Sequence, residues 1–411
     1  MASRGIRDQV AIIGMGCTKF GERWDQGVDD LLTDAATEAA ASAGLSIHDL
    51  DAFWLGTMTS GVCGVTLSRP LKLDYKPVTR VENYCATGSE AFRNACYAVA
   101  SGAYDTAMAI GVEKLKDTGF SGLTGIRAVG DGTDPGLSSP AAFSFLAPSY
   151  GHKYGVDPVQ MKEVMSRIAF KNHQNGARNP RAQFQKEVSM ETITKAPLVA
   201  GELGVFDCSG VSDGSAAAII CRAADAHKYC DNPLYVKALS FVAGPAAGPI
   251  DPAYDYTTFE EVVRSVEDAY RQAGITDPRA QLAMAEVHDC FTPTELVLME
   301  DLGFAARGTA WKEVLAGTFD RDGELPVNPD GGLKSFGHPI GASGLRMLFE
   351  CWLQLRGEAP ADRQISTVGP GRTLGLTHNL GGAPGEGVSF VGIVGTELDD
   401  PGLGNTDFAA G

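Results

Sequence analysis

Four short segments of the chain contain cysteine or histidine residues that could take part in catalysis. In the first, residues 81–89, Cys85 precedes a helix predicted over residues 90–100. The unpaired N–H groups and positive dipole end of a helix start stabilise an anion, which would lower the pKa of the Cys85 thiol and make it a nucleophile. A buried structural cysteine is the alternative interpretation, because free cysteine is among the most buried residue types.

The second segment, residues 286–292, holds a histidine and a cysteine two positions apart. His288 and Cys290 follow a predicted strand and precede a helix predicted over residues 295–302. Side chains two apart at a strand end point to the same side, so both can reach one cleft. A core histidine beside a buried cysteine fits this short string equally well.

The third and fourth segments are rich in glycine. Residues 328–344 place His338 among five glycines ahead of a helix, which would let a ligand approach closely. Residues 377–387 contain Asn379, Gly381 and Gly382 after an apolar strand. Backbone N–H groups of such a loop can face developing negative charge, as an oxyanion hole requires. A tight turn between two edge strands is the alternative for this fourth segment.

The elements around these segments indicate an α/β protein with an internal duplication. One helical face over residues 31–43 ends at Gly44 and precedes a short buried strand at 51–56. A second helix over residues 259–273 ends at Gly274 and precedes the apolar run 282–287. The two stretches are alike and lie 230 positions apart, so we expect two similar βαβ halves.

An insertion separates the two predicted halves at about residues 116–204. It is rich in glycine, proline and polar residues, with one amphipathic helix expected around Met161, Val164 and Ile168. Long inserted segments in compact proteins commonly serve as lids or binding segments. The stretch 118–150 is loosely patterned and says little about a substrate pocket.

Composition excludes several classes of protein. The 411 residues carry a net charge of −17 without a run of Lys or Arg, which argues against a nucleic-acid partner. We expect neither a signal peptide nor a membrane span, because no apolar run reaches about 18 residues. Nine cysteines without paired spacing suggest reduced thiols and a cytoplasmic location. A metal site is not expected, because CxxC and HExxH are absent.

Taken in order, the four segments resemble the catalytic loops of thiolases. The string His288-Asp289-Cys290-Phe291 makes the chain similar to the subfamily associated with sterol carrier protein, the lipid-transfer-protein thiolases. Further matching strings are VAIIGMGCTKFG near the start, GVEK at Gly111 and SDGSAA at Ser212. The resemblance covers roughly residues 8–397.

The resemblance implies a thiolase fold: two duplicated βαβ halves in a five-layered αβαβα arrangement with an inserted loop or lid region. The N-terminal half would comprise residues 1–115 and 205–235, and the insertion residues 116–204. The C-terminal half would comprise residues 236–397, followed by a loose tail at 398–411. Such enzymes are normally homodimers or dimers of dimers.

The resemblance also implies roles for single residues. Cys85 would be the acylated nucleophile, His338 would activate it, and His288 would donate to an oxyanion. Backbone N–H groups of Cys85 and Gly381 would form a second oxyanion hole, in the loop with Asn379 and Gly382. Most thiolases have a cysteine where this chain has Asn379, and Cys290 would replace it as the acid/base thiol.

The implied activity is acyl-CoA C-acyltransfer: cleavage of a 3-oxoacyl-CoA with CoA to acyl-CoA plus acetyl-CoA or propionyl-CoA, or the reverse Claisen condensation. CoA would be a substrate, and no permanently bound cofactor is expected. One alternative is a retro-aldolase or acyltransferase on steroid or lipid CoA thioesters, acting with a small OB-fold/zinc-ribbon partner. Another is a non-catalytic protein that binds lipid or CoA. The nucleotide end of CoA would need local cations, and candidates are Lys171, Arg178 and Arg181. A solvated basic face is the alternative interpretation of these three residues.

Overall fold

The computed structural model describes residues 5–117, 137–248 and 251–399. The N-terminal half opens with the expected strand, helix and strand. Helix α1 buries the predicted leucine and alanine face and ends at Gly44, whose φ of 64° is a left-handed conformation that glycine adopts without strain. The elements of this half are β1 (Val10–Cys17), α1 (Val28–Ala43), β2 (Ala52–Gly56), α2 (Val65–Leu71), β3 (Val78–Val81), α3 (Thr87–Ala100), β4 (Thr106–Glu113) and β7 (Gly214–Arg222).

The C-terminal half follows a similar succession of elements, with additional helices between its strands. Helix α8 presents its valine and alanine face to the sheet, as the sequence predicts, and ends at Gly274 with a φ of 73°. The elements of this half are β8 (Leu234–Ala243), α8 (Glu260–Ala273), α9 (Pro278–Gln281), β9 (Leu282–Glu286), α10 (Thr292–Asp301), α11 (Ala310–Ala316), α12 (Gly332–Ser335), α13 (Ser343–Leu355), β10 (Leu374–Ala383) and β11 (Glu386–Gly395).

The strand order shows the duplication. The described strands form a nine-stranded sheet in the order β3-β2-β4-β7-β1-β8-β11-β10-β9. Within it β2-β4-β7-β1 corresponds to β9-β10-β11-β8, with one parallel pair followed by antiparallel pairs in each half. Strands β1 and β8 meet only over Ala11–Tyr235 and Ile12–Leu234, so two similar sheets join at a short seam.

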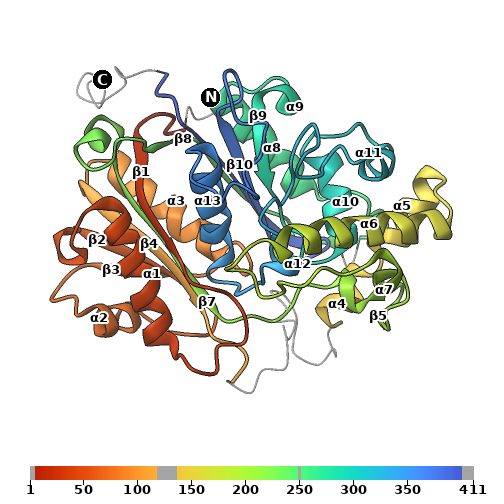
Figure 1. The fold of residues 1–411 in the computed structure, drawn as a ribbon, viewed down its shortest axis with the longest axis horizontal. Coiled ribbons are helices and arrows are strands. Elements are labelled where there is room, and N and C mark those ends of the chain that lie inside the picture. Colours follow the sequence, from red (N-terminus) through yellow and green to blue (C-terminus); the bar gives the residue numbers. More distant parts are fainter. Residues whose placement is uncertain (1–4, 118–136, 249–250, 400–411) are drawn as a thin grey trace.

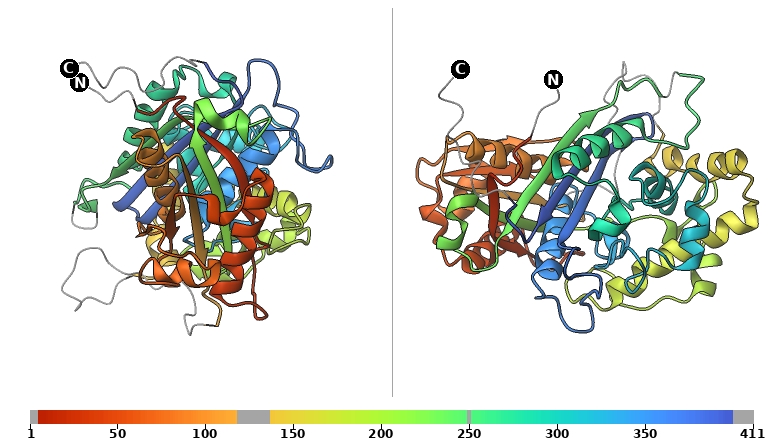
Figure 2. Two further views of the ribbon diagram at one scale, coloured as in Figure 1. Left: turned by 90° about the vertical axis from the view of Figure 1, so that its left-hand side faces the viewer. Right: turned by 90° about the horizontal axis from the view of Figure 1, so that it is seen from above.

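Helices cover these sheets in layers. Helices α3 and α13 pack against each other between the two halves, and they lie near the centre of Figure 1. Helix α1 covers the outer face of the N-terminal strands, and α8 covers the outer face of the C-terminal strands, where Figure 2 shows it from above. Residues of this central layer, such as Phe92, Leu345 and Trp352, pack together in the hydrophobic core. This arrangement brings the starts of α3 and α13 together.

The inserted region is more helical than the expected loop or lid. Short helices of this region contact the C-terminal half, and the polar, glycine-rich sequence does not predict them. Residues 118–136 lie outside the described ranges. The amphipathic helix expected around Met161 is confirmed, and its start at Pro158 is capped by the side chain of Asp157. The elements are α4 (Ser139–Phe143), α5 (Leu146–Tyr154), α6 (Pro158–Ala177), α7 (Met190–Thr194), β5 (Leu198–Ala200) and β6 (Leu203–Gly204).

The domain boundaries themselves stay predictions. The boundary set at 235/236 falls inside β8, which begins at Leu234. Most of the tail, residues 400–411, lies outside the described residues. Asp399 just before it pairs with Arg7 and Lys237 at 2.6 and 3.0 Å. None of the helices in the described ranges has the length and apolar character that a membrane span requires.

Candidate active site

Cys85 lies in a tight turn immediately before α3. Tyr84 has a φ of 50°, a conformation that costs energy in a non-glycine residue and often marks a functional turn. The turn is closed by hydrogen bonds from Ala86 N to Asn83 O and from Thr87 N to Tyr84 O, both 3.0 Å. Thr87 Oγ1 accepts from Asn83 N at 2.8 Å. Local hydrogen bonding therefore fixes the backbone that carries the cysteine.

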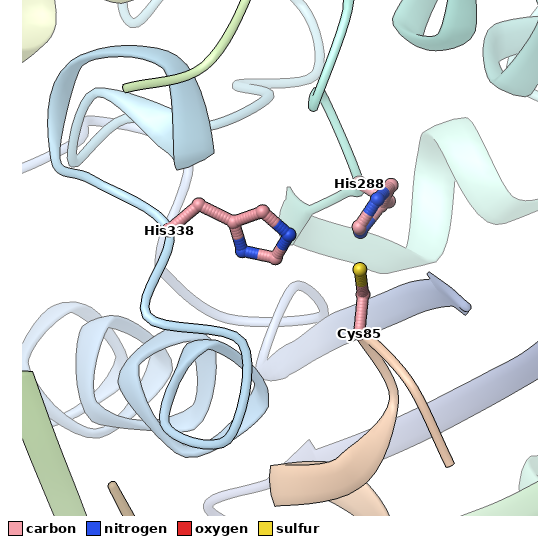
Figure 3. A group of neighbouring side chains, drawn as sticks. All are labelled: Cys85, His288 and His338. Carbon is pink, nitrogen blue, oxygen red and sulfur yellow. The ribbon is translucent and has the colours of Figure 1, made fainter. Parts of the chain in front are cut away.

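Three elements bring Cys85, His288 and His338 together. The Cys85 Sγ and one ring nitrogen of each histidine all lie within 4.8 Å of one another. The two imidazole rings are T-shaped, with centroids 5.4 Å apart, and both histidines are buried. Figure 3 shows the thiol and the His338 ring both directed toward His288. The turn before α3, the segment after β9 and the segment between α12 and α13 supply these residues.

The hydrogen bonds of His338 determine which ring nitrogen is free to act as a base. Its Nδ1 lies 2.7 Å from Ser343 Oγ, and that hydroxyl donates its proton to Pro339 O at 3.1 Å. Ser343 Oγ therefore accepts a hydrogen bond from Nδ1–H, which assigns the Nδ1–H tautomer. The buried Nε2 has no hydrogen-bond partner in the structure. His338 thus presents an unprotonated nitrogen to the site.

Burial sets the charge states of the three residues. It lowers the pKa of His338 to about 3 and holds the pKa of His288 well below its usual value, with the neighbouring histidines adding to the effect on His288. Burial, followed by the Glu82 carboxylate, raises the pKa of Cys85 to about 12. The predicted lowering of the Cys85 pKa by the helix start is wrong, because desolvation of the thiolate outweighs the helix dipole. At neutral pH the three groups are an uncharged thiol and two uncharged imidazoles.

Glycines allow the His338 segment to approach α3. A Cβ at Gly111 would lie 1.9 Å from the carbonyl oxygen of Gly341, and a Cβ at Gly88 would lie 2.6 Å from the same atom. The Gly341 N–H donates to the buried carboxylate of Glu113 at 3.2 Å. Glu113 also accepts from the backbone N–H groups of residues 58–60. Backbone contact, possible only with glycine, therefore places His338 beside Cys85.

The fourth predicted segment lies in β10 and in the hairpin to β11. These strands are interior to the sheet, so the alternative of a turn between edge strands is wrong, because β9 and β8 flank the pair. A Cβ at Gly381 would lie 2.7 Å from Asn83 O, so Gly381 packs against the Cys85 turn. Asn379 is buried and its Oδ1 accepts from Ser89 Oγ on α3 at 2.6 Å. Gly382 has a φ of 94°, which favours glycine.

Cys290 stands apart from the group of three. Its thiol is buried, lies 3.9 Å from Thr294 Oγ1, and has a pKa raised well above the usual value by burial and then by Cys85. That electrostatic influence places Cys290 near Cys85, but its sulfur is not within the cluster formed with His288 and His338. Its part as an acid/base thiol stays a prediction.

Of the residues expected to bind CoA, Lys171 lies in the protein interior and not at the surface. It is buried, pairs with Glu295 at 2.8 Å and donates to Val327 O at 2.7 Å, so its charge is neutralised inside the protein. Arg181 pairs with Glu38 at 2.6 Å, and Arg178 is exposed. Thiolate and imidazole are also ligand types for zinc, and the absence of a resident metal stays a prediction.

Sequence patterns did not reveal several residues that support the site. Ser343 orients His338, Ser212 Oγ accepts from His338 N at 3.0 Å, and Glu113 holds Gly341. His378 is also buried near His288, and neither of its ring nitrogens has a hydrogen-bond partner among the described residues. Ser212 and Glu113 lie far in sequence from the residues that they contact. Ser343 lies close to His338 in sequence, but the sequence does not show that the two side chains meet.

Comparisons with known proteins identify the family. The family model "Thiolase, N-terminal domain" matches residues 10–224, and "Thiolase C-terminal domain-like" matches residues 249–391. An acetyl-CoA acetyltransferase of Methanothermobacter thermautotrophicus is 37% identical over 92% of this chain and 98% of its own. Human sterol carrier protein 2 is 31% identical over 91% of this chain and 70% of its own.

A solved structure supports the same assignment of the fold. The protein titled "Ltp2-ChsH2(DUF35) aldolase" superposes with a TM-score of 0.79 at 23% identity, covering 95% of this chain and 98% of its own. Human mitochondrial 3-ketoacyl-CoA thiolase also superposes, with a TM-score of 0.68 at 18% identity, covering 95% of this chain and 99% of its own. The expected thiolase fold is therefore confirmed, with two similar halves around the layer of α3 and α13. The chain belongs to the thiolase family of acyl-CoA acyltransferases.

Proposed function

We propose that this enzyme cleaves 3-oxoacyl-CoA with CoA, or runs the reverse Claisen condensation, through an acyl group on Cys85. The observation that carries the proposal is the meeting of Cys85 Sγ with ring nitrogens of His288 and His338 within 4.8 Å. A soft nucleophile, a base and a donor to an oxyanion are the groups that this chemistry needs. CoA enters as a substrate.

The first half-reaction forms the acyl-enzyme. The Cys85 proton passes to the free Nε2 of His338 as the sulfur attacks the C3 carbonyl carbon of the substrate. His288, which is uncharged, donates a hydrogen bond to the developing oxyanion. The C2–C3 bond then breaks, the acyl group stays on sulfur, and the C2 carbanion of the departing CoA ester takes a proton, for which Cys290 is the proposed donor.

The second half-reaction transfers the acyl group to CoA. The thiol of the incoming CoA loses its proton to a base of the site and attacks the acyl carbon. Backbone N–H groups of Cys85 and Gly381 are the proposed donors to this second oxyanion, and the packing of Gly381 against residues 83–84 supports this. The bond to Cys85 breaks and its sulfur regains a proton from His338.

Mass spectrometry of the acylated protein tests the proposal. We expect incubation with acetyl-CoA to add one acetyl group to the peptide containing Cys85, and Cys85→Ala to abolish both this adduct and thiolysis. Cys63→Ala is the control, because Cys63 is exposed and lies outside the site. Full thiolysis by Cys85→Ala across several acyl chain lengths would refute the mechanism.

Retro-aldol cleavage of a CoA thioester is the second candidate. Its support is the fold similarity to the "Ltp2-ChsH2(DUF35) aldolase", whose name includes a DUF35 component. Aldol cleavage does not require an acyl-cysteine, whereas the placement of Cys85 beside two histidines suits acyl transfer. A Cys85→Ala variant that still cleaves a β-hydroxyacyl-CoA, only when a small partner protein is added, would favour this candidate.

We also propose that the protein is a homodimer in a reducing compartment such as the cytoplasm. Strand β3 is an edge strand of the described sheet, and exposed apolar side chains lie near it at Val62, Val65 and Tyr75. A sheet edge beside exposed apolar side chains favours association with a second copy. All nine cysteines are free, which suits reduced thiols.

A further inference from the structure

Asp289 separates the two predicted acid/base residues His288 and Cys290 in sequence, and its own side chain is fully buried. Its Oδ1 accepts from Leu333 N at 2.6 Å, and its Oδ2 accepts from Lys334 N at 3.2 Å. Asn172 Nδ2 donates to the same Oδ2 at 2.8 Å. Both carboxylate oxygens are therefore engaged by donors that come from two other parts of the chain.

The backbone donors belong to α12, the short helix that leads into the His338 segment. Gly332, its first residue, has a φ of 63°, and a Cβ there would lie 2.4 Å from Asp289 Oδ2. The carboxylate therefore rests directly on the backbone of this turn. His338 follows Lys334 by four residues, so a shift of α12 relative to Asp289 is passed to the His338 ring.

A second set of side chains surrounds the carboxylate. Asn172 Nδ2 also donates to Glu295 at 2.8 Å, and Asn328 Nδ2 donates to the same Glu295 carboxylate at 3.1 Å. Asn328 Oδ1 in turn accepts from Val287 N at 2.8 Å. The chain around His288 is thus tied to the chain before His338 from both sides, with α6 of the insertion supplying Asn172.

The geometry points to Asp289 as a positioning residue that sets the separation of His288 and His338. One neighbour of Asp289 in sequence is His288, and the groups that its carboxylate holds lie on the segment leading to His338. The two rings, 5.4 Å between centroids, must both face one reacting carbonyl for the proposed function, on which this inference rests. Displacement of a reacting group by about 1 Å can reduce a rate about a hundredfold.

Asp289→Asn tests the inference with little change in volume. The amide offers one acceptor oxygen and one NH₂ group, so an N–H donor of the neighbours meets another donor. We expect kcat for thiolysis to fall about tenfold to a hundredfold, while KM for both CoA substrates changes less than about threefold. The loss should fall on kcat because the fully buried carboxylate holds the backbone that leads to the His338 imidazole.

Asp51→Asn is the matched control. The Asp51 carboxylate also accepts from two consecutive backbone N–H groups, those of Asp105 and Thr106, and from Thr106 Oγ1, but it lies at the start of β2 away from the site. We expect this control to keep kcat within about twofold of the wild type, even where its melting temperature falls as much as that of Asp289→Asn.

Gly332→Ala is a second variant that keeps the carboxylate but pushes it away from α12, and we expect the same loss in kcat.

Hydrogen exchange of the peptide 332–338 gives a measurement that needs no turnover: exchange should quicken in Asp289→Asn and not in Asp51→Asn. Unchanged exchange, or a loss seen only in KM, would overturn the positioning role. A wild-type enzyme without an acyl-cysteine would overturn the proposed function instead, and the exchange result would still decide the role of Asp289.

Discussion

At the scale of single residues, the resting site holds no charged pair between cysteine and histidine. Burial disfavours both the thiolate and the imidazolium, which raises the pKa of Cys85 and lowers that of His338. In the proposed mechanism, proton transfer from Cys85 Sγ to His338 Nε2 would therefore be coupled to attack on the substrate. The developing charge then moves onto the substrate oxygen, where His288 can donate a hydrogen bond.

The pH dependence of Cys85 alkylation follows from these values. With a thiol pKa of about 12, the thiolate is the minor form throughout pH 7–9, and its population rises tenfold for each pH unit. We expect the rate of iodoacetamide modification at Cys85, followed by peptide mass spectrometry, to rise nearly tenfold per pH unit over this range. A rate that stays level above pH 6 would show a thiolate–imidazolium pair instead.

Ser343 should control the base through the His338 ring. Ser343→Ala removes the acceptor of Nδ1–H, so the ring loses both its orientation and its tautomer preference. We expect kcat to fall about tenfold to a hundredfold, within the range of a general-base contribution. Ser265→Ala, which removes another buried hydroxyl on the outer helix α8, should leave kcat unchanged. Equal losses in both variants would contradict the assignment.

At the scale of elements, close backbone contact between β4 and the His338 segment determines where the base lies. Gly111→Ala would place a Cβ 1.9 Å from Gly341 O, and a carbonyl cannot yield as a flexible side chain can. We expect a loss in unfolding free energy of about 1–3 kcal/mol or more, together with a loss in kcat. Chemical denaturation and steady-state kinetics measure the two effects.

Gly369→Ala is the comparison for this variant, because a Cβ at Gly369 would meet nothing within 4 Å. Its stability should stay within about 0.5 kcal/mol of the wild type, as for most surface changes. Wild-type stability and kcat in Gly111→Ala would show that the His338 segment can move away without consequence.

At the scale of the whole molecule, the edge strand β3 and its apolar neighbours predict the dimer. We expect sedimentation to give twice the chain mass of 43.2 kDa for the wild type. Val65→Glu places a charge on this surface and should shift the protein toward the single-chain mass. Val159→Glu, at an exposed valine on α6, should leave the mass unchanged. A wild-type protein of 43.2 kDa would contradict the prediction.

The sequence by itself determined the periodic and local features of the molecule. The apolar faces of α1 and α8, their glycine ends and the strands β2 and β9 follow from spacing and propensity, and these revealed the duplication. The ordered segments around Cys85, His288 and His338 indicated the family and the residue types for acyl transfer.

Only the tertiary structure decided how those residues behave. The raised pKa of Cys85 depends on desolvation, the free nitrogen of His338 depends on how its ring is turned toward Ser343, and the burial of Lys171 depends on the distant Glu295. Asp289 stands between two functional residues in the sequence, and only the fold places α12 on its carboxylate. A sequence pattern specifies which face of an element is apolar, whereas solvation and hydrogen-bond partners are settled only when separate elements pack together.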